Sequence, residues 1–234
     1  MSLISDNLQA VRAAILKAGR ESGRIPGSVK LVAVSKTFGA DAVLEAARAG
    51  QQAFGENYLQ EAVDKIMWMQ AHAPDMPIEW HFIGPLQSNK TRQVAELFSW
   101  VHSVERAKIA QRLSDQRPAE MAPLNICLQV NISGEDSKSG VMPDQLAELA
   151  EQVSSLPRLT LRGLMAVPEP SADVRQQRSA FRALKQLSDD LRARGHELDT
   201  LSMGMSADMW AAVAEGSTLV RIGTAIFGSR HYAQ

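Results

Sequence analysis

Short apolar segments alternate with amphipathic helical segments along the whole chain, and this alternation constrains the fold more than any other feature. The clearest apolar runs cover residues 31–34, 124–132 and 159–165. Continuous runs of this kind are typical of strands buried on both faces, as in parallel sheets. Weaker strand segments are predicted at residues 52–54, 80–83, 100–102, 198–201 and 218–222.

The segments between these runs carry apolar residues at helical spacing. The chain opens with such a segment, in which Leu8, Val11 and Ile15 share one face. We expect Gly50 to end a helix and Pro143 to occupy the first turn of another. The later helices are predicted over residues 41–48, 59–67, 90–98, 105–113, 143–153, 174–191 and 208–214.

Strict alternation of strands and helices predicts an α/β fold with a parallel sheet and right-handed crossovers. Eight such units in 234 residues predict a single (β/α)8 barrel of the TIM type, with an extra N-terminal helix. An open, doubly wound sheet is the alternative. No linker or low-complexity segment interrupts the pattern, so we expect one domain over residues 1–234.

Composition limits the classes of function. The net charge is −1, with 25 basic and 26 acidic residues, whereas nucleic-acid binders usually carry a basic excess. The single cysteine, Cys127, permits no internal disulfide. Residues 1–20 do not resemble a signal peptide, and no apolar stretch reaches the ~18 residues of a membrane span. We expect a cytoplasmic protein that binds neither nucleic acid nor membrane.

A lysine follows the first strand directly: residues 34–37 are Val-Ser-Lys-Thr. In a (β/α)8 barrel, the carboxyl ends of the strands form the mouth of the active site. A partly desolvated lysine there loses its proton more easily, and its amine can attack an aldehyde. A surface lysine just beyond the strand is the alternative interpretation of Lys36.

Small residues follow the last two strands, in residues 202–206 and 221–228. They let backbone N–H groups approach an anion closely, and the loops after strands seven and eight are the usual phosphate site of such barrels. After the second strand, Glu56 and Asn57 either face a ligand or begin the next helix.

Several other chemistries have weak support. Residues 84–91 resemble a phosphate-binding P-loop, but Asn89 replaces a required glycine and Pro85 removes an N–H donor. The five histidines show no metal-binding spacing, and no G-x-S-x-G motif occurs. His81 is either a ligand contact inside the barrel or a hydrogen-bonded core histidine.

Taken together, these motifs resemble the pyridoxal phosphate homeostasis protein family. The matching segments are residues 33–36, 54–58, 81–90, 202–206 and 220–224, in the family's order over nearly the whole chain. The resemblance implies a barrel like the N-terminal domain of alanine racemase. One departure is the loop of residues 38–40, Phe-Gly-Ala, where relatives often carry a lysine or proline, so no role for a second lysine in that loop is carried over to this chain.

The resemblance also implies pyridoxal 5'-phosphate (PLP) as the cofactor. The implied binding set is Lys36 as the Schiff-base lysine, Arg221 at the pyridine nitrogen, Ser206, Gly223 and Thr224 at the phosphate, and Asn57 and Met165 beside the cofactor. Lys65, Lys90 and Lys138 remain candidates for a transient second attachment.

Three hypotheses of function follow. A racemase needs a second acid or base on the far face of the ring, and the chain has only Tyr58 and Tyr232 as tyrosines and ends shortly after Arg221. We therefore expect a monomeric, non-catalytic carrier of PLP in vitamin B6 and amino-acid homeostasis, with apo-enzymes as recipients. A small PLP-dependent enzyme such as an amino-acid racemase is the second hypothesis. A Schiff-base aldolase that uses Lys36 without cofactor is the third.

Overall fold

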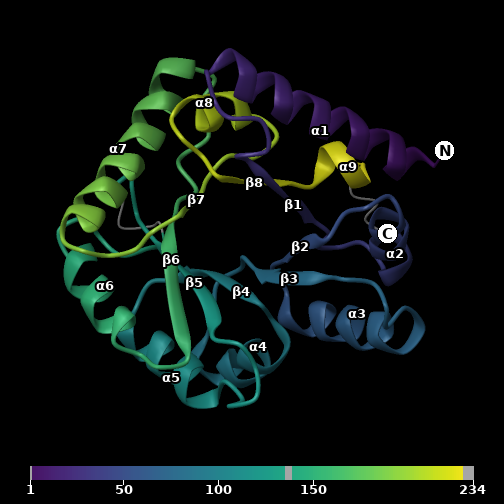
Figure 1. Ribbon diagram of the computed structural model, residues 1–234, viewed down its shortest axis with the longest axis horizontal. Coiled ribbons are helices and arrows are strands. Elements are labelled where there is room, and N and C mark those ends of the chain that lie inside the picture. Colours follow the sequence, from purple (N-terminus) through teal and green to yellow (C-terminus); the bar gives the residue numbers. More distant parts are fainter. Residues whose placement is uncertain (1, 135–138, 229–234) are drawn as a thin grey trace.

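The computed structural model describes residues 2–134 and 139–228. Eight parallel strands form its centre (Figure 1). The strands are β1 (Lys30–Val34), β2 (Ala53–Glu56), β3 (Glu79–Phe82), β4 (Trp100–Val104), β5 (Leu124–Gln129), β6 (Leu159–Met165), β7 (Thr200–Ser202) and β8 (Leu219–Ile222).

The strands pair in chain order and close into a barrel. Closure comes from parallel pairing of β1 with β8, in which Leu31 lies opposite Val220 and Ala33 opposite Ile222. The predicted barrel is confirmed. The alternative of an open, doubly wound sheet is wrong, because the strands pair in chain order and the pairing of β1 with β8 closes the barrel.

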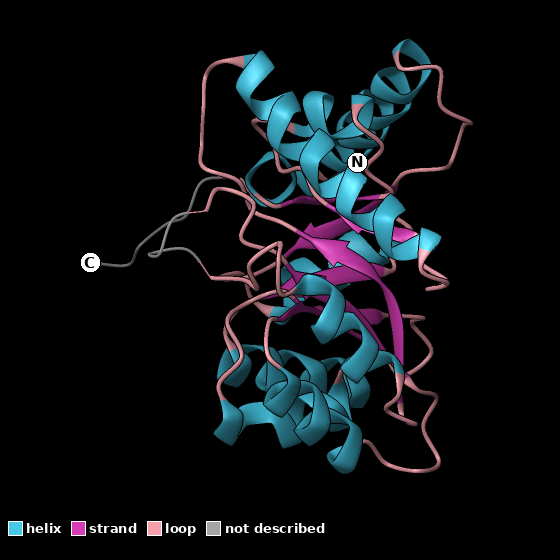
Figure 2. Cartoon of the chain, turned by 90° about the vertical axis from the view of Figure 1, so that its left-hand side faces the viewer, coloured by secondary structure: helices cyan, strands magenta, loops and turns pink. Residues whose placement is uncertain are grey.

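Helices surround the strands on the outside (Figure 2). They are α1 (Leu3–Glu21), α2 (Ala40–Arg48), α3 (Leu59–His72), the short 3-10 helix η1 (Ser88–Lys90), α4 (Thr91–Leu97), α5 (Ala107–Gln116), α6 (Leu146–Ser154), α7 (Val174–Ala193), α8 (Met209–Ala214) and α9 (Thr224–Phe227). The extra N-terminal helix α1 packs against α2, α8 and α9, across the junction of β8 with β1. Within the described residues, no helix combines the length and apolar character needed to cross a membrane.

The core has an outer layer between strands and helices and a smaller layer inside the barrel. The outer layer includes Val43, Phe54 and Phe181, which are almost fully buried. A separate cluster of Trp100, Cys127 and Met165 comes from adjacent strands and belongs to the inside. Apolar residues alone do not fill the interior, because His81, His102, Ser202 and Arg221 are also buried.

Element ends differ from the sequence predictions in places. Gly50 does follow the end of α2, with a φ of +82°. Pro143 does not begin a helix. It lies in a turn in which its carbonyl accepts from the Leu146 N–H, and α6 begins at Leu146. The short α9 was not predicted, because it spans one turn and has too few residues to show a period.

Candidate functional site

The residues proposed for the site all lie at the carboxyl end of the barrel. Because the strands are parallel, the segments after β1, β2, β7 and β8 emerge at the same end. Those strands and β6 are consecutive around the barrel, so the site residues form one arc. The arc contains Met165 at the end of β6, Ser206 after β7, Arg221, Gly223 and Thr224 on and after β8, Lys36 after β1 and Asn57 after β2.

Lys36 lies in a tight turn two residues beyond β1 and is half-buried. The Phe38 N–H donates to the Ser35 carbonyl across this turn over 3.1 Å. Thr37 has a φ of +68°, a left-handed conformation that a β-branched residue rarely adopts. Its N–H donates to the Glu61 carboxylate, which holds the turn in place. The backbone on both sides of Lys36 is therefore fixed.

A buried ionic cluster contacts this turn at Ser35, the residue before Lys36. The Glu56 carboxylate accepts from the Ser35 hydroxyl at 2.6 Å and from the Lys65 ammonium at 2.7 Å. Lys65 also donates to the Ser35 carbonyl at 2.8 Å and pairs with Glu61 at 2.7 Å. Burial raises the pKa of Glu56, although Lys65 and the Ser35 hydrogen bond oppose the rise. The cluster joins β1, β2 and α3 immediately beside Lys36.

This cluster bears on two questions that the sequence left open. Glu56 does not begin a helix, because it ends β2. Its Oε1 accepts from Ser35 and Lys65, whereas its Oε2 is buried without a hydrogen-bond partner in the described part of the chain. Lys65 is almost fully buried and all three of its N–H donors are used, so its amine is not a nucleophile. Lys90 is exposed at the end of η1, and Lys138 lies outside the described residues.

Asn57 offers an unused acceptor. Its side-chain oxygen is buried and has no hydrogen-bond partner within the described part of the chain. Gly84 packs directly against its backbone: a methyl group at Gly84 would lie 2.2 Å from the Asn57 carbonyl oxygen. Only glycine permits this close approach, so the loop after β3 fixes Asn57 from one side. A buried acceptor without a partner is costly unless a ligand donor reaches it.

Arg221 is the buried cation of the arc. One of its terminal nitrogens donates to the Ser202 carbonyl and hydroxyl oxygens, each at 2.6 Å, and the other donates to the Ala166 carbonyl at 3.0 Å. Burial lowers its pKa to about 10, so the guanidinium remains charged at neutral pH. These three bonds leave further N–H donors of the guanidinium for a ligand.

The loop after β8 meets the Lys36 turn. The rings of Phe38 and Phe227 lie 5.2 Å apart, which brings the turn against the last residue of α9. The backbone N–H of Arg221 donates to the Gly204 carbonyl at 2.9 Å, so β8 and the loop after β7 are also joined. Ser206 and Thr224 are exposed, as groups that bind a phosphate from solvent must be.

Met165 and His81 lie deeper in the barrel. Met165 is 1% exposed and packs with Trp100 and Cys127. His81 contacts Glu79 and His102 through its ring nitrogens. Of the two interpretations offered for it, the hydrogen-bonded core histidine is the one that the structure shows. Burial raises the pKa of the Cys127 thiol to about 12, which leaves it unreactive.

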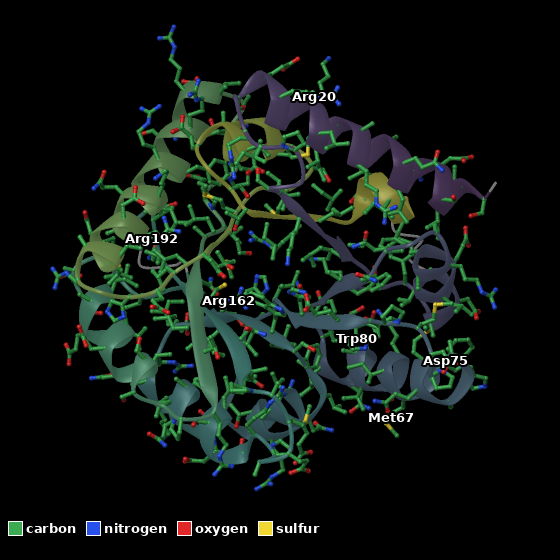
Figure 3. The ribbon with its side chains drawn as sticks, viewed as in Figure 1. Arg20, Met67, Asp75, Trp80, Arg162 and Arg192 are labelled. Carbon is green, nitrogen blue, oxygen red and sulfur yellow. The ribbon has the colours of Figure 1, made fainter. Side chains whose placement is uncertain are left out.

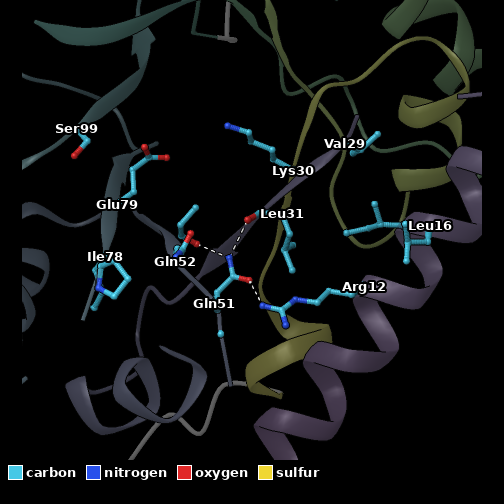
Figure 4. A pocket seen from close by; sticks show the side chains of 14 residues that line it. Arg12, Leu16, Val29, Lys30, Leu31, Gln51, Gln52, Ile78, Glu79 and Ser99 are labelled. Atoms are coloured by element: carbon cyan, nitrogen blue, oxygen red, sulfur yellow. Dashed lines mark hydrogen bonds between the residues drawn. The ribbon is translucent and has the colours of Figure 1, made fainter. Parts of the chain in front are cut away.

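Two of the hollows in the described structure bear on where a ligand could bind. The larger, about 800 Å³, lies at the amino ends of β1, β2 and β3 beside α1, and thus at the end of the barrel opposite Lys36 (Figure 4). Gln51 crosses it, donating to the Leu31 carbonyl and accepting from Arg12. A hollow of about 510 Å³ lies beside the Lys36 turn and is lined by Thr37, Phe38 and Trp68 among others. Neither of these two hollows is lined by a residue of the arc, so the hollows do not identify the site.

The residues fit PLP in chemical type. The arc offers an amine for an aldehyde, a buried cation for a ring nitrogen, an unpaired amide oxygen, and exposed hydroxyls near small residues for a phosphate. The supporting residues Ser35, Glu61, Lys65 and Phe38 were not predicted. Lys65 gave a signal in retrospect, because it falls on the buried face of α3 with Ala62, Ile66 and Met69.

Comparison with known proteins gives the family and the fold of the chain. The sequence model of the family described as "Alanine racemase, N-terminal domain" matches residues 7–231. The chain is 59% identical over 232 residues to a pyridoxal phosphate homeostasis protein of Pseudomonas aeruginosa, covering 99% of this chain and 98% of that protein. It is 56% identical over 234 residues to the protein of the same name from Vibrio cholerae, covering 100% and 99%.

Solved structures give the same result. PipY of Synechococcus elongatus with PLP bound has a TM-score of 0.82 at 34% identity, covering 96% of this chain and 100% of that one. An alanine racemase of Clostridium difficile has a TM-score of 0.72 at 14% identity, covering 95% of this chain and 57% of that one, and so shows a shared fold alone. The chain has the barrel fold of the alanine racemase N-terminal domain and belongs to the pyridoxal phosphate homeostasis protein family.

Proposed function

We propose that this chain binds PLP as a Schiff base with Lys36 and acts as a non-catalytic carrier of the cofactor. The observation that carries the proposal is the Lys36 turn, fixed by a buried ionic cluster at the carboxyl end of the barrel. A relative of the same fold has been solved with PLP bound, and its 34% identity covers 96% of this chain. These facts support PLP as the cofactor, and the carrier role rests on Arg221 and on the position of Tyr58.

In this proposal, each residue of the arc has one task. The Lys36 amine condenses with the cofactor aldehyde, and one water leaves as the C=N bond forms. Ser206, Gly223 and Thr224 bind the phosphate, while Asn57 and Met165 lie beside the cofactor. Bound PLP supplies an electron-withdrawing ring, whose strength depends on the protonation of its pyridine nitrogen.

Arg221 argues against strong catalysis. A cation facing the pyridine nitrogen disfavours its protonation, so the ring withdraws electrons weakly. A racemase also needs a second acid or base opposite Lys36. In the described residues Tyr58 is the sole tyrosine, and it is exposed directly before α3. Tyr232 lies outside the described residues.

The proposed setting follows from the carrier role. The 234-residue chain acts as one cytoplasmic, monomeric domain, and apo-enzymes that need PLP are its recipients. A weak amino-acid racemase is the second candidate. Its support is the fold shared with alanine racemases at 14% identity, which indicates no activity by itself.

Two measurements on the PLP-loaded protein separate the candidates. We expect apo-enzymes to regain activity faster when mixed with the loaded protein than with buffer, and no exchange of amino-acid α-protons in deuterated water. Lys36→Ala, treated with PLP and freed of unbound cofactor, is the control and should transfer nothing. Stereochemical α-proton exchange that requires Lys36 would establish the racemase instead. A protein that never retains PLP would contradict both.

A further inference from the structure

Two buried histidines inside the barrel have no role in the proposed function. His81 on β3 and His102 on β4 are 1% and 0% exposed. Nδ1 of His81 lies 2.9 Å from Nε2 of His102. Two imidazoles can share a hydrogen bond only if one nitrogen carries the proton and the other does not. Their contact therefore restricts the tautomers of both rings.

The pair is the middle of a longer series of hydrogen bonds. On one side, His81 Nε2 lies 2.8 Å from a carboxylate oxygen of Glu79. On the other side, His102 Nδ1 lies 2.7 Å from the Ser202 hydroxyl, which accepts from Arg221 at 2.6 Å. The series crosses the barrel from Glu79, at the start of β3, to Arg221, near the end of β8.

The ends of the series fix its direction. Arg221 can only donate, so the Ser202 oxygen accepts from it, and an ionised Glu79 can only accept, so His81 donates to it. With both rings neutral, the Ser202 O–H therefore donates to His102 Nδ1. His102 then carries its proton on Nε2 and donates to His81 Nδ1. His81 carries its proton on Nε2 and donates to the Glu79 carboxylate. Every donor meets an acceptor when both rings are neutral and Glu79 is ionised.

The charges around the rings support these protonation states. Burial lowers the pKa of His81, Glu79 opposes this and Lys30 adds to it. The pKa of His102 lies well below 6.5, because of burial and the charges of His81 and Arg221. The hydrogen bond from His81 is the main cause of a lowered pKa at Glu79. Protonation of His81 would reverse the tautomer of His102 and aim its Nδ1–H at the Ser202 oxygen. That oxygen would then accept from both His102 and Arg221, and its O–H would lose its acceptor.

We propose that Glu79, His81, His102 and Ser202 form a positioning relay that orients Arg221 and makes its hydrogen bonding depend on the charge at Glu79, at the opposite end of the barrel. The relay concerns the cofactor only insofar as Arg221 faces the pyridine nitrogen, which rests on the proposed function. None of the four residues is a catalytic residue, because each acts through Arg221.

The far end of the relay is open to small molecules. Glu79 is about half exposed and lines a cavity of about 290 Å³ with Lys30, Trp100 and Arg162. Arg162 on β6, which is labelled in Figure 3, forms an ion pair with Asp199. Lys30 and Glu79 also border the larger hollow of Figure 4. Protons and small cations therefore reach Glu79 without passing the Lys36 turn.

Nitrogen-15 NMR of the cofactor-free protein tests the relay. At neutral pH we expect both His81 and His102 as neutral rings protonated at Nε2. Glu79→Gln should lower the pH at which His81 titrates and shift the His102 and Arg221 signals, whereas Glu197→Gln, at an exposed glutamate outside the relay, should shift neither. Ser202→Ala should shift Arg221 but leave the His81 tautomer unchanged. An Nδ1-protonated His102, or an Arg221 signal unchanged in Glu79→Gln, would overturn the relay.

A second readout uses the loaded protein. The pH dependence of the PLP absorption band should change in Glu79→Gln and in Ser202→Ala, and remain unchanged in Glu197→Gln. If the NMR result holds and the band does not respond, the link from the relay to the cofactor is overturned. If no PLP is retained at all, the proposed function fails, while the NMR result on the relay stands.

Discussion

Among single residues, the most informative is Lys65, because it explains how Lys36 is held. Its ammonium neutralises Glu56, pairs with Glu61 and donates to the Ser35 carbonyl next to Lys36. A buried pair of this kind contributes little net stability compared with a well-packed apolar replacement. Breaking it is costly, however, because one charge then stays buried without its partner. The cluster thus makes the position of the Lys36 turn sensitive to each of its members.

Lys65→Met is predicted to destabilise the fold strongly. It leaves the Glu56 carboxylate buried and unpaired, at a cost of about 3–5 kcal/mol in the free energy of unfolding. Adding Glu56→Gln should recover a large part of this loss, because the buried charge is removed. Urea unfolding of the two variants measures both effects. Lys17→Met is the matched control: its pair with Glu21 is exposed at 3.9 Å and should contribute less than about 1 kcal/mol. Additive losses in the double variant would contradict the account.

Among the strands, close backbone contacts determine the shape of the barrel. Gly163 on β6 lies so near β7 that a methyl group there would be 1.7 Å from the Thr200 carbonyl oxygen. No rotamer can relieve that contact, because both partners are backbone. The position of β7, and with it Ser202 and the loop to Ser206, therefore depends on one missing side chain.

Gly163→Ala is predicted to cost about 3 kcal/mol or more in the free energy of unfolding, since overpacking against backbone cannot relax by repacking. Gly19→Ala in α1 is the matched control. A methyl group there meets Arg24 at an ordinary 3.8 Å, and alanine is the better helix former by up to about 1 kcal/mol. Thermal and urea unfolding measure both variants. Equal stability of the two would show that β6 and β7 can separate without cost.

The same elements show how far the sequence could predict the molecule. Residues 159–165 were predicted as a strand with the bounds that β6 has, because a continuous apolar run depends on burial alone. The strand predicted over residues 198–201 begins two residues before β7 and ends one residue before its end, because Leu198 is buried outside β7 and looks like a strand residue. The order of the strand ends was enough to gather Lys36, Asn57 and Arg221 at one end.

The contacts inside the site could not be predicted. Glu79 and Ser202, with His102 between them, lie 123 positions apart in the sequence, and no local pattern joins them. Glu56 was interpreted from its place beside a helix start, whereas a lysine on the next helix determines its role. Long-range pairing of polar groups depends on packing that single-sequence periodicity does not describe.

Across the whole molecule, the barrel has two distinct ends. The carboxyl end carries the proposed PLP site, with Lys36 fixed by charged groups and Arg221 held by Ser202 and Ala166. The amino end carries the larger hollow and the exposed carboxylate of Glu79. The interior joins the two through hydrogen-bonded histidines in place of apolar side chains. This arrangement agrees with the proposed role, in which PLP is bound at one end of the barrel and Arg221 is influenced from the other.

The most direct test of the account is borohydride reduction of the PLP-loaded protein, followed by peptide mass mapping. We predict a visible absorption band that borohydride removes, and one modified peptide that contains Lys36. Lys65 should be unmodified, and Lys36→Ala should show neither the band nor the modification. A modified lysine elsewhere in the wild-type protein, or a protein that stays colourless with added PLP, would contradict the central claim that Lys36 holds the cofactor.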